Sequence, residues 1–247
     1  MLTVIVVVKN DEVTIRRCLE SVAFADEIIV LDAGSTDNTL SISKEFTEHV
    51  FTTENWLGRG IQKQQALSEA KGDWVLSLEV DEAISESLKD EIKEVMAENS
   101  VDACNIPVRM SFYNQILNHT GNPSQPIRLF KKANARFSED QVNEQVFLTK
   151  GSEIGTMEHP ILHFRYRDLR HALFQINRDS SFAAKKRIQA RRQSNLFTIL
   201  FSTGWTFFKN FILQRGFLDG KAGFLIAAIN AQASFYAGMK QIFRDSH

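Results

Sequence analysis

Two apolar stretches of the sequence end in carboxylates whose types and spacing suit the binding of a cation and of hydroxyl groups. Asp32 directly follows the stretch 28–31, and Glu79 and Asp81 follow the stretch 74–78. An acid-x-acid pair directs two side chains the same way and can bind a hard divalent cation through oxygen ligands. Either group alone is as well explained by a solvated turn. Their shared place after apolar stretches favours a site, in which such a cation would neutralise a diphosphate.

The apolar stretches themselves predict the elements that carry these carboxylates. Runs of β-branched and aliphatic residues at 4–8, 28–31 and 74–78 are typical of buried parallel strands. Helical spacing of apolar residues follows them, at 13–22 and 88–96. Alternation of strands and helices predicts an α/β fold with a mostly parallel sheet. Ligands of such sheets bind beyond the carboxyl ends of the strands, which is where the carboxylates lie.

The pattern changes twice further along the chain. Short strand-like pieces separated by Gly, Pro and Asn occupy 101–162, and from about residue 167 the pattern is helical. We therefore expect a core over residues 1–162 and a helical extension over residues 163–247.

Charge is divided unevenly between these two parts. The 29 Lys and Arg and the 30 Asp and Glu leave a net charge of −1. Residues 1–162 hold 15 basic and 26 acidic side chains, a net of −11, and residues 163–247 hold 14 basic and 4 acidic ones, a net of +10. Such asymmetry indicates contact with nucleic acid or with a membrane. The hydrophobic fraction of 43% excludes a disordered or collagen-like chain.

Several other classes are disfavoured by missing or broken motifs. Cys18 and Cys104 are the two cysteines and form no metal-ligand spacing, which favours a reducing compartment. The first ten residues lack the features of a signal peptide, and we expect them to form a buried strand. His159 and His163 are four apart, but Pro160 lies between them, so we expect loop or strand residues rather than a helical metal pair.

The extension is basic and rich in phenylalanine. Nine of the 19 phenylalanines lie within residues 196–247, and the apolar run 196–213 contains a lysine and an asparagine. Residues 165–192 carry nine basic and two acidic side chains. Basic segments beside aromatic-rich helices are typical of helices that lie on anionic lipid. We expect contact with an anionic membrane surface, not a membrane span and not nucleic acid, for which no recognisable module is present. The alternative is that these apolar faces cover the sheet or a partner subunit.

Several sequence blocks resemble the inverting nucleotide-sugar glycosyltransferases of family 2. Within that family the chain is most similar to the bacterial lipopolysaccharide-core β-1,4-glucosyltransferases that act on heptose. The similarity covers nearly the whole chain and is carried by residues 8–12, 25–28, 32–39, 72–78, 128–130, 135–138, 166–169 and 215–220. It implies the GT-A fold, a Rossmann-like and mostly parallel sheet flanked by helices, with a C-terminal helical extension.

The resemblance also implies roles for individual residues. Asp32 would contact the uridine of a nucleotide-sugar donor, and Lys9, Glu12, Gln62 and Lys63 would lie near the nucleotide. A lysine and the N-terminal amides of a helix both suit phosphate.

A divalent cation, Mg²⁺ or Mn²⁺, would bridge the diphosphate in such an enzyme. Asp81 is its expected ligand, with help from Glu79, which stands where the family usually has aspartate.

One carboxylate must act as the base in an inverting transfer. It takes the proton of the acceptor hydroxyl as that oxygen attacks the anomeric carbon. The resemblance places this base within residues 138–144, with Glu144 as the first candidate and Asp140 as the second.

Together these features predict a metal-dependent hexosyltransferase that uses a UDP-linked hexose. The resemblance implies a lipid-anchored acceptor such as a lipopolysaccharide inner-core heptose, and a peripheral place at the cytoplasmic face of the inner membrane. Three alternatives stay open: action on another bacterial glycolipid or polysaccharide, a non-catalytic sugar-nucleotide or membrane-binding module, and a sugar-phosphate nucleotidyltransferase. The last is disfavoured because residues 8–12 contain no glycine for a phosphate loop.

Overall fold

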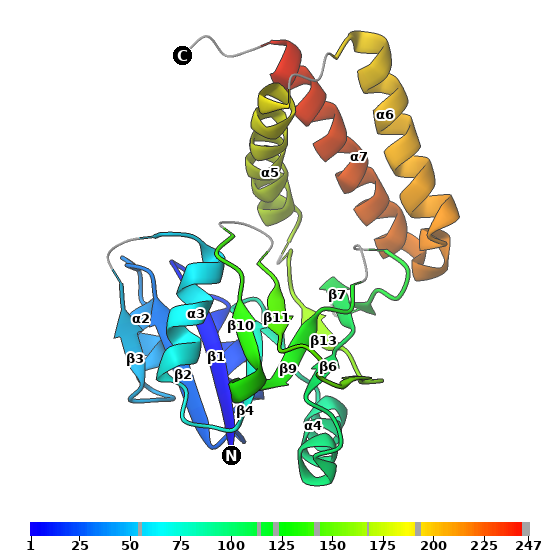
Figure 1. Ribbon diagram of the computed structural model, residues 1–247. Helices are drawn as coiled ribbons and strands as arrows, with labels where there is room; N and C mark the ends of the chain where they lie inside the picture. Colours follow the sequence, from blue (N-terminus) through cyan, green and yellow to red (C-terminus); the bar gives the residue numbers. More distant parts are fainter. Residues whose placement is uncertain are drawn as a thin grey trace. The chain divides into compact units, whose positions relative to one another are not determined.

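A computed structural model describes residues 1–53, 56–112, 115–120, 124–140, 144–166, 168–190 and 194–243 (Figure 1). The chain divides into two compact units. The first comprises residues 1–108 and 124–163, and the second comprises residues 109–123 and 164–247. The second unit is therefore assembled from two separate parts of the chain.

The first unit is built on a seven-stranded mixed sheet. Its strands follow one another in the order β12, β6, β9, β4, β1, β2, β3. Parallel pairing joins β1 to β2 and β4, β2 to β3, and β12 to β6, whereas β9 is antiparallel to both of its neighbours. The strands are β1 (Leu2–Val8), β2 (Glu27–Asp32), β3 (Val50–Thr52), β4 (Trp74–Glu79), β6 (Ala103–Asn105), β9 (Ile127–Lys131) and β12 (Ile154–Thr156).

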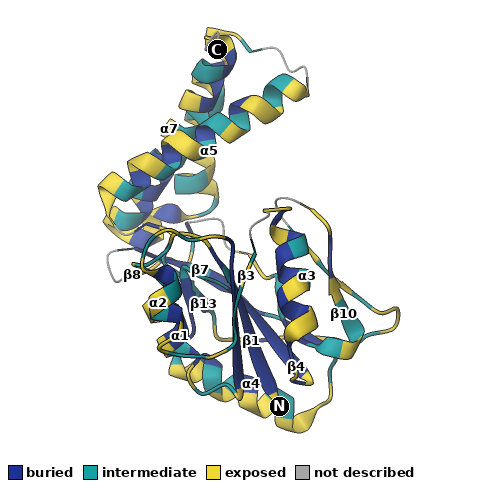
Figure 2. Ribbon diagram, turned by 90° about the vertical axis from the view of Figure 1, so that its left-hand side faces the viewer, coloured by how far each residue is buried: buried dark blue, intermediate teal, exposed yellow. Residues whose placement is uncertain are grey.

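Helices cover both faces of this sheet, as the unbroken β-branched run of β1 requires. Val4, Val6 and Val8 enter one apolar core, whereas Ile5 enters the other. Figure 2 shows these central strands as buried. Alternate residues of a strand point to opposite faces, so a strand covered on both sides is apolar throughout. The helices are α1 (Ile15–Ser21), α2 (Thr39–Ser43), α3 (Arg59–Glu69) and α4 (Glu86–Glu98).

Shorter elements complete the first unit. An antiparallel pair joins β5 (Glu82–Ala83) to β13 (Ile161–His163) and places His163 opposite Glu82. A second pair joins β10 (Ala135–Phe137), which follows the 3₁₀ turn η1 (Lys132–Asn134), to β11 (Val146–Leu148). Cys18 and Cys104 are buried free thiols of this unit. Burial raises the pKa of both thiols, that of Cys104 to about 11.

The second unit is mainly helical. Its small β-pair is formed by β7 (Val108–Phe112), from Arg109 on, and β8 (Gln115–Ile116). Three long helices follow, and α7 packs against both α5 and α6. These elements are α5 (Leu169–Gln189), α6 (Leu196–Phe208), the π-helical turn η2 (Lys209–Leu213), the 3₁₀ turn η3 (Gly216–Asp219) and α7 (Gly220–Ile242). Together with the first unit, this confirms the predicted α/β class with a helical C-terminal region.

Asp219 joins the two separate parts of the second unit. Its buried carboxylate accepts hydrogen bonds from the backbone N–H groups of Asn118, His119 and Thr120, at 3.1, 3.0 and 2.8 Å. The hydroxyl of Thr120 donates a fourth, at 2.7 Å. These four hydrogen bonds offset the free-energy cost of burying the Asp219 carboxylate. The residues preceding α7 therefore fix the loop that follows β8.

Candidate active site

The candidate carboxylates lie at one edge of the sheet because their strands are parallel. In the strand register Val8 lies opposite Asp32 of β2, and Val7 lies opposite Glu79 of β4. The end of β1 is thus flanked by an acidic residue on each side. The two strand ends therefore lie on either side of β1, and the roles of their carboxylates stay predictions.

Asp32 is buried and shapes the turn that follows β2. Its Oδ2 accepts hydrogen bonds from the backbone N–H groups of Gly34 and Ser35, at 3.1 and 2.9 Å. The Ser35 hydroxyl donates to Oδ1. Gly34 adopts a positive φ of 80°, which suits glycine. The turn and its carboxylate are therefore preorganised at the strand end.

Glu12 lies beside this turn, and Lys9 is exposed at the end of β1. The Glu12 carboxylate accepts hydrogen bonds from both the backbone and the side-chain nitrogens of Asn38, at 3.0 and 2.9 Å. Asn38 precedes α2, so Glu12 ties the loop after β1 to the start of that helix. The donor-binding roles of Lys9 and Glu12 stay predictions.

Lys63 is the centre of a compact cluster of charges. Its ammonium lies 2.5 Å from the carboxylates of both Glu79 and Glu144, and its side chain is only 4% exposed. Arg128 contacts Glu79 at 3.5 Å and Glu82 at 2.8 Å. With Arg59, 3.4 Å from Glu79, the cluster holds three cations and three carboxylates. The strand end of β4, helix α3 and the residues before β11 are joined by these pairs.

The cluster shifts the ionisation of its members. Burial alone would raise the pKa of Glu79, but Lys63, Arg128 and Arg59 hold it well below the usual range. Burial raises the pKa of Glu82 despite the nearby Arg128. Burial alone would lower the pKa of Arg128, yet the Glu82 and Glu79 carboxylates raise it. Glu79 is therefore a carboxylate whose charge is already balanced by protein cations.

Asp81 has different surroundings. His163 Nε2 lies 3.0 Å from Asp81 Oδ2, and the two side chains are 26% and 33% exposed. Burial would raise the pKa of Asp81, but the hydrogen bond from His163 and its charge lower it. His159 instead contacts Glu91 at 2.9 Å, so the two histidines are not a metal pair.

A carboxylate oxygen and an imidazole nitrogen this close can bind one cation together, and both ligand types suit Mn²⁺. Across the described ranges, no group of three His, Cys, Asp or Glu side chains gathers as a metal site. The remaining ligands of a cation at Asp81 would come from water or from a diphosphate, which is how Mg²⁺ is commonly held. His163 was not among the sequence candidates, because its partner lies 82 residues earlier and the local sequence carries no sign of it.

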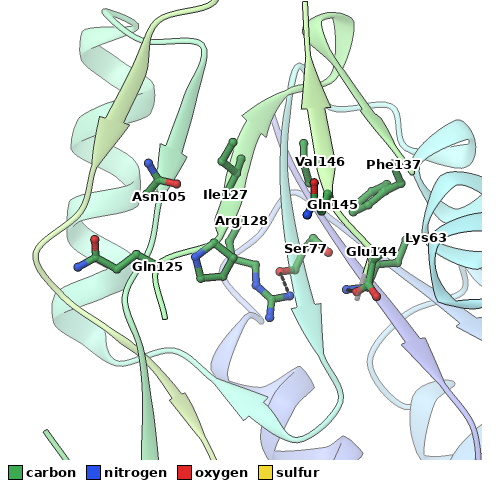
Figure 3. Close-up of a pocket in the computed structure, with 11 residues that line it drawn as sticks. Lys63, Ser77, Asn105, Gln125, Ile127, Arg128, Phe137, Glu144, Gln145 and Val146 are labelled. Atoms are coloured by element: carbon green, nitrogen blue, oxygen red, sulfur yellow. Dashed lines mark hydrogen bonds and ion pairs between the residues drawn. The ribbon is translucent and has the colours of Figure 1, made fainter. Parts of the chain in front are cut away.

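A cavity of about 410 Å³ adjoins the charge cluster (Figure 3). Glu144, Lys63 and Arg128 line it, together with Ser77 and several amide side chains. Arg128 donates to the Ser77 carbonyl at 3.3 Å, whereas Arg128 Nε and Ser77 Oγ have no hydrogen-bond partner within the described part of the chain. Both atoms are buried, and the accessible lining includes charged and amide side chains, which suit a ligand rich in hydroxyl groups.

Two further candidates lie near the cluster without joining it. Gln62 is buried in α3, directly before Lys63. Asp140 is exposed, and its backbone carbonyl accepts the Gly60 N–H at 3.1 Å. A side chain at position 60 would collide with the Ser138 carbonyl, so this close approach requires glycine at position 60. Residues 141–143 lie outside the described residues. The structure thus brings Glu144, but not the Asp140 carboxylate, into the charge cluster.

The mixed α/β sheet with carboxylates beyond the ends of its parallel strands is shared by several classes of enzyme, and comparisons with known proteins identify the class. Residues 3–148 match the family described as "Glycosyl transferase family 2". The chain belongs to this family, and the protein is a glycosyltransferase, as predicted.

Relatives and solved structures extend this likeness over the whole chain. An uncharacterized glycosyltransferase of Rickettsia bellii is 29% identical over 93% of this chain and 82% of its own length. The lipopolysaccharide core biosynthesis glycosyltransferase LpsC of Rhizobium meliloti is 21% identical over 97% of this chain and 91% of its own length. The crystal structure of S. aureus TarS 1–349 shares the fold, with a TM-score of 0.52 and 16% identity over 100% of this chain and 92% of that one.

Proposed function

We propose that the protein is a cation-dependent, inverting hexosyltransferase that uses a UDP-linked sugar, with glucose as the expected hexose. One observation carries the proposal. Glu79 binds the same Lys63 ammonium that binds Glu144, and it precedes Asp81 by two residues. A candidate cation ligand and a candidate base are thus tied to the end of one strand, in a chain of family 2.

Asp81 and His163 would hold the cation. The donor set of one carboxylate and one imidazole, 3.0 Å apart and partly exposed, fits Mn²⁺ or Mg²⁺ with open positions for a diphosphate. When bound, the cation would neutralise the diphosphate that leaves with the nucleoside. Glu79 is already paired with three protein cations, so we assign it to the charge cluster and keep Asp81 as the carboxylate ligand. TarS, which shares the fold, has been crystallised in complex with UDP-GlcNAc, which supports a UDP-sugar donor.

Glu144 would act as the base. Its carboxylate takes the proton of an acceptor hydroxyl while that oxygen forms a bond to the anomeric carbon, and the bond from that carbon to the diphosphate breaks. The side chain is 10% exposed at the lining of the cavity. Lys63 holds this carboxylate in place, so its position is set before the acceptor binds.

The cavity beside Glu144 would take the acceptor sugar. Its lining includes charged and amide side chains, among them Glu144, Arg128 and Gln145, which suit saccharide hydroxyls. We propose a lipopolysaccharide inner-core saccharide such as heptose, which the name of the R. meliloti relative LpsC supports. The reaction would then take place at the cytoplasmic face of the inner membrane.

A screen of nucleotide sugars tests the proposal directly. Purified protein is incubated with UDP-glucose, UDP-galactose, UDP-GlcNAc or a GDP-hexose, with and without Mn²⁺ and truncated lipopolysaccharide, and release of nucleoside diphosphate is measured. We expect cation-dependent release that rises when the acceptor is present. Calorimetric binding of the donors with neither hydrolysis nor transfer would favour a non-catalytic sugar-nucleotide module instead.

Asp81→Ala tests the cation site. We expect it to lower the transfer rate at least about 100-fold, because the diphosphate loses its counter-charge. Glu94→Ala, at an exposed position of α4, is the matched control and should retain activity. An undiminished rate in Asp81→Ala would remove the proposed site.

Glu144→Gln tests the base. We expect donor binding to persist and transfer to fall about 100- to 10,000-fold, because the amide cannot accept the proton. Asp140→Asn is measured in parallel. Normal transfer by Glu144→Gln together with loss in Asp140→Asn would move the base to Asp140.

A further inference from the structure

Helix α6 of the second unit presents its large apolar side chains to solvent. The exposed fractions include 77% for Phe197, 66% for Phe201 and 50% for Trp205. We call this row the α6 stripe; its members are Leu196, Phe197, Leu200, Phe201, Trp205 and Phe208. Their spacing puts them along one side of the helix. An exposed apolar surface of this kind marks an interaction site.

The opposite side of α6 faces α7 and is mostly polar, with Ile199 and Phe207 as its apolar members; the Phe207 ring contacts Phe224 of α7. Ser202, Thr203 and Thr206 on that side donate their hydroxyl hydrogens to carbonyls of their own helix. The side chain of Asn230 in α7 donates to Asn210 Oδ1 at 3.0 Å, just beyond the end of α6. This arrangement is the reverse of a helix in water, whose apolar side faces its neighbour and whose polar side faces solvent.

The close approach of the two helices shows that α6 is held in this orientation. Ile199, on the α7 side, is the one buried apolar residue of α6, and it lies against Gly238. A Cβ atom at position 238 would lie 2.6 Å from Ile199 Cγ1, so the two helices meet through glycine at this point. The packing of Ile199 against Gly238 therefore fixes the rotation of α6 and keeps the stripe on the side away from α7.

Charges around the stripe are of one sign. From Ser180 to Arg244 the sequence contains a single acidic residue, Asp219. That carboxylate is buried and bonded to the loop after β8, so it offers no negative charge to the surface. Lys209, Arg215 and Lys221 are exposed next to or beyond the end of α6, and no described carboxylate pairs with them.

We propose that the α6 stripe inserts into the interface of an anionic lipid bilayer, with the helix lying in the membrane plane. Aromatic and aliphatic side chains enter the acyl boundary, while the neighbouring lysines and arginine meet lipid phosphates. A protein partner would have to supply apolar and acidic surface together, whereas an anionic bilayer offers both everywhere. In a dimer formed through the stripe, the basic side chains near the stripe of one copy would repel those of the other copy. This repulsion disfavours such a dimer.

The helix lies in the interface and does not span. The segment 196–213 is long and apolar enough to cross a membrane by length and composition, with mean hydropathy 1.3. Its α7 side, however, carries hydroxyl and amide groups, and Lys209 lies within it. A spanning helix would place these groups at membrane depth, where polar groups are costly. A helix with one apolar side and one polar side is suited to lie at a shallow depth in the bilayer, with its apolar side towards the acyl chains.

Vesicle co-sedimentation of the full chain tests the docking. The vesicles are phosphatidylcholine alone or equal parts of phosphatidylcholine and phosphatidylglycerol. We expect binding to the mixed vesicles that weakens as salt is raised. Phe197→Ser combined with Phe201→Ser should lower the partition coefficient at least about tenfold, because two exposed rings no longer enter the acyl boundary. Ile154→Ser, at a 51% exposed position of strand β12, is the matched control and should bind as the native chain does.

Two further measurements keep the proposal falsifiable. Mixed vesicles should shift the tryptophan emission to shorter wavelength, and Trp205→Phe should abolish that shift. Lys209→Glu with Arg215→Glu should weaken binding to the mixed vesicles, with Lys71→Glu in the first unit as the control.

Three outcomes would overturn the proposal. They are equal binding to both kinds of vesicle, unchanged binding by the double Phe→Ser variant, and a dimer in analytical ultracentrifugation that this variant dissociates. The last would assign the stripe to a subunit interface. Because no donor or acceptor enters these measurements, their failure leaves the proposed transferase reaction untouched, and the reverse also holds.

Discussion

At the scale of single residues, one ammonium group is shared by two carboxylates. Lys63 lies 2.5 Å from both Glu79 and Glu144 and is almost fully buried. These two short ion pairs occupy two of the three N–H donors of the ammonium. We propose that Lys63 positions Glu144; the nucleotide-binding role that the family resemblance implies for Lys63 stays a prediction.

Lys63→Met distinguishes the two roles. We expect kcat to fall about 100-fold with little change in the KM for the donor, because Glu144 loses the contact that fixes its position. Lys63→Arg, which keeps the positive charge, should recover part of kcat. Steady-state rates at several donor concentrations give both constants. A large rise in the donor KM with kcat retained would instead restore the nucleotide-binding role.

The same variant should also be less stable. Removing one member of a buried ion cluster leaves carboxylates without their counter-charge, at a cost of about 3 kcal/mol. Unfolding by urea, followed by circular dichroism, measures this difference. The kinetic constants are therefore compared at a temperature where both proteins are folded.

Which contacts of the site could be predicted depended on how far apart the two residues lie in the sequence. Asp32 and Glu79 were predicted to lie together because parallel strands end at one edge, a rule that needs only the strand pattern. The pairing of Asp81 with His163 requires β13 to return beside β5, and nothing local to His163 specifies that pairing. Lys63 and Glu144 are likewise 81 residues apart.

At the scale of elements, Asp102 joins three strands near the edge of the sheet. Just before β6, its carboxylate accepts hydrogen bonds from Lys131 of β9 at 3.2 Å, from the Asn134 side chain at 3.1 Å and from the backbone N–H of Glu153 before β12 at 3.1 Å. The hydrogen bond from Glu153 and the contacts with Lys131 lower the pKa of Asp102. Ionised Asp102 therefore stabilises the junction of these strands.

Asp102→Asn should be less stable than the native chain in a manner that depends on pH. The folded pKa lies below the unfolded value of about 3.9, so the ionised group stabilises the fold fully above that pH. The contribution is lost as pH falls through the folded pKa. The difference in melting temperature between the two proteins should thus be largest near neutral pH and shrink below about pH 4. An equal difference at every pH would show that titration of Asp102 plays no part.

Element types were easier to predict than their assignment to units. The β-branched run of β1 and the helical spacing of α1 and α4 specify local structure, and these elements formed as predicted. The place of residues 109–123 in the second unit was not predictable, because it depends on Asp219, about 100 residues later, and on apolar contacts with α5 and α7.

At the scale of the whole molecule, the second unit needs both of its parts. Met110, Phe112 and Leu117 are buried in one apolar cluster with residues of α5 and α7. A chain cut after residue 163 would keep these three side chains and lose their partners.

We expect such a truncated chain to aggregate or to bind a hydrophobic dye strongly, because its apolar side chains are left uncovered. Fluorescence with such a dye and gel filtration check this outcome. A monomeric, dye-free product with native-like melting would show that residues 1–163 fold without the helices.

The charge division of the sequence gains a structural meaning at this scale. The acidic part includes three carboxylates that are balanced by Lys63, Arg59 and Arg128, so its net charge of −11 is carried by residues outside this cluster. In the basic part, the only carboxylate after Ser180 in the described residues is that of Asp219, which is buried, so the charged side chains exposed between there and residue 243 are basic. The net charge of −1 for the whole chain therefore describes neither the acidic part nor the basic part.

The two buried thiols make the native chain a suitable background for site-directed labelling. Cys18 and Cys104 are shielded from solvent, and burial raises the pKa of both, so neither presents a reactive thiolate near neutral pH. A cysteine introduced at an exposed position of α6 would then react with a maleimide probe faster than either native cysteine. A spin label or fluorophore attached there would report its depth in a bilayer without prior removal of the native cysteines.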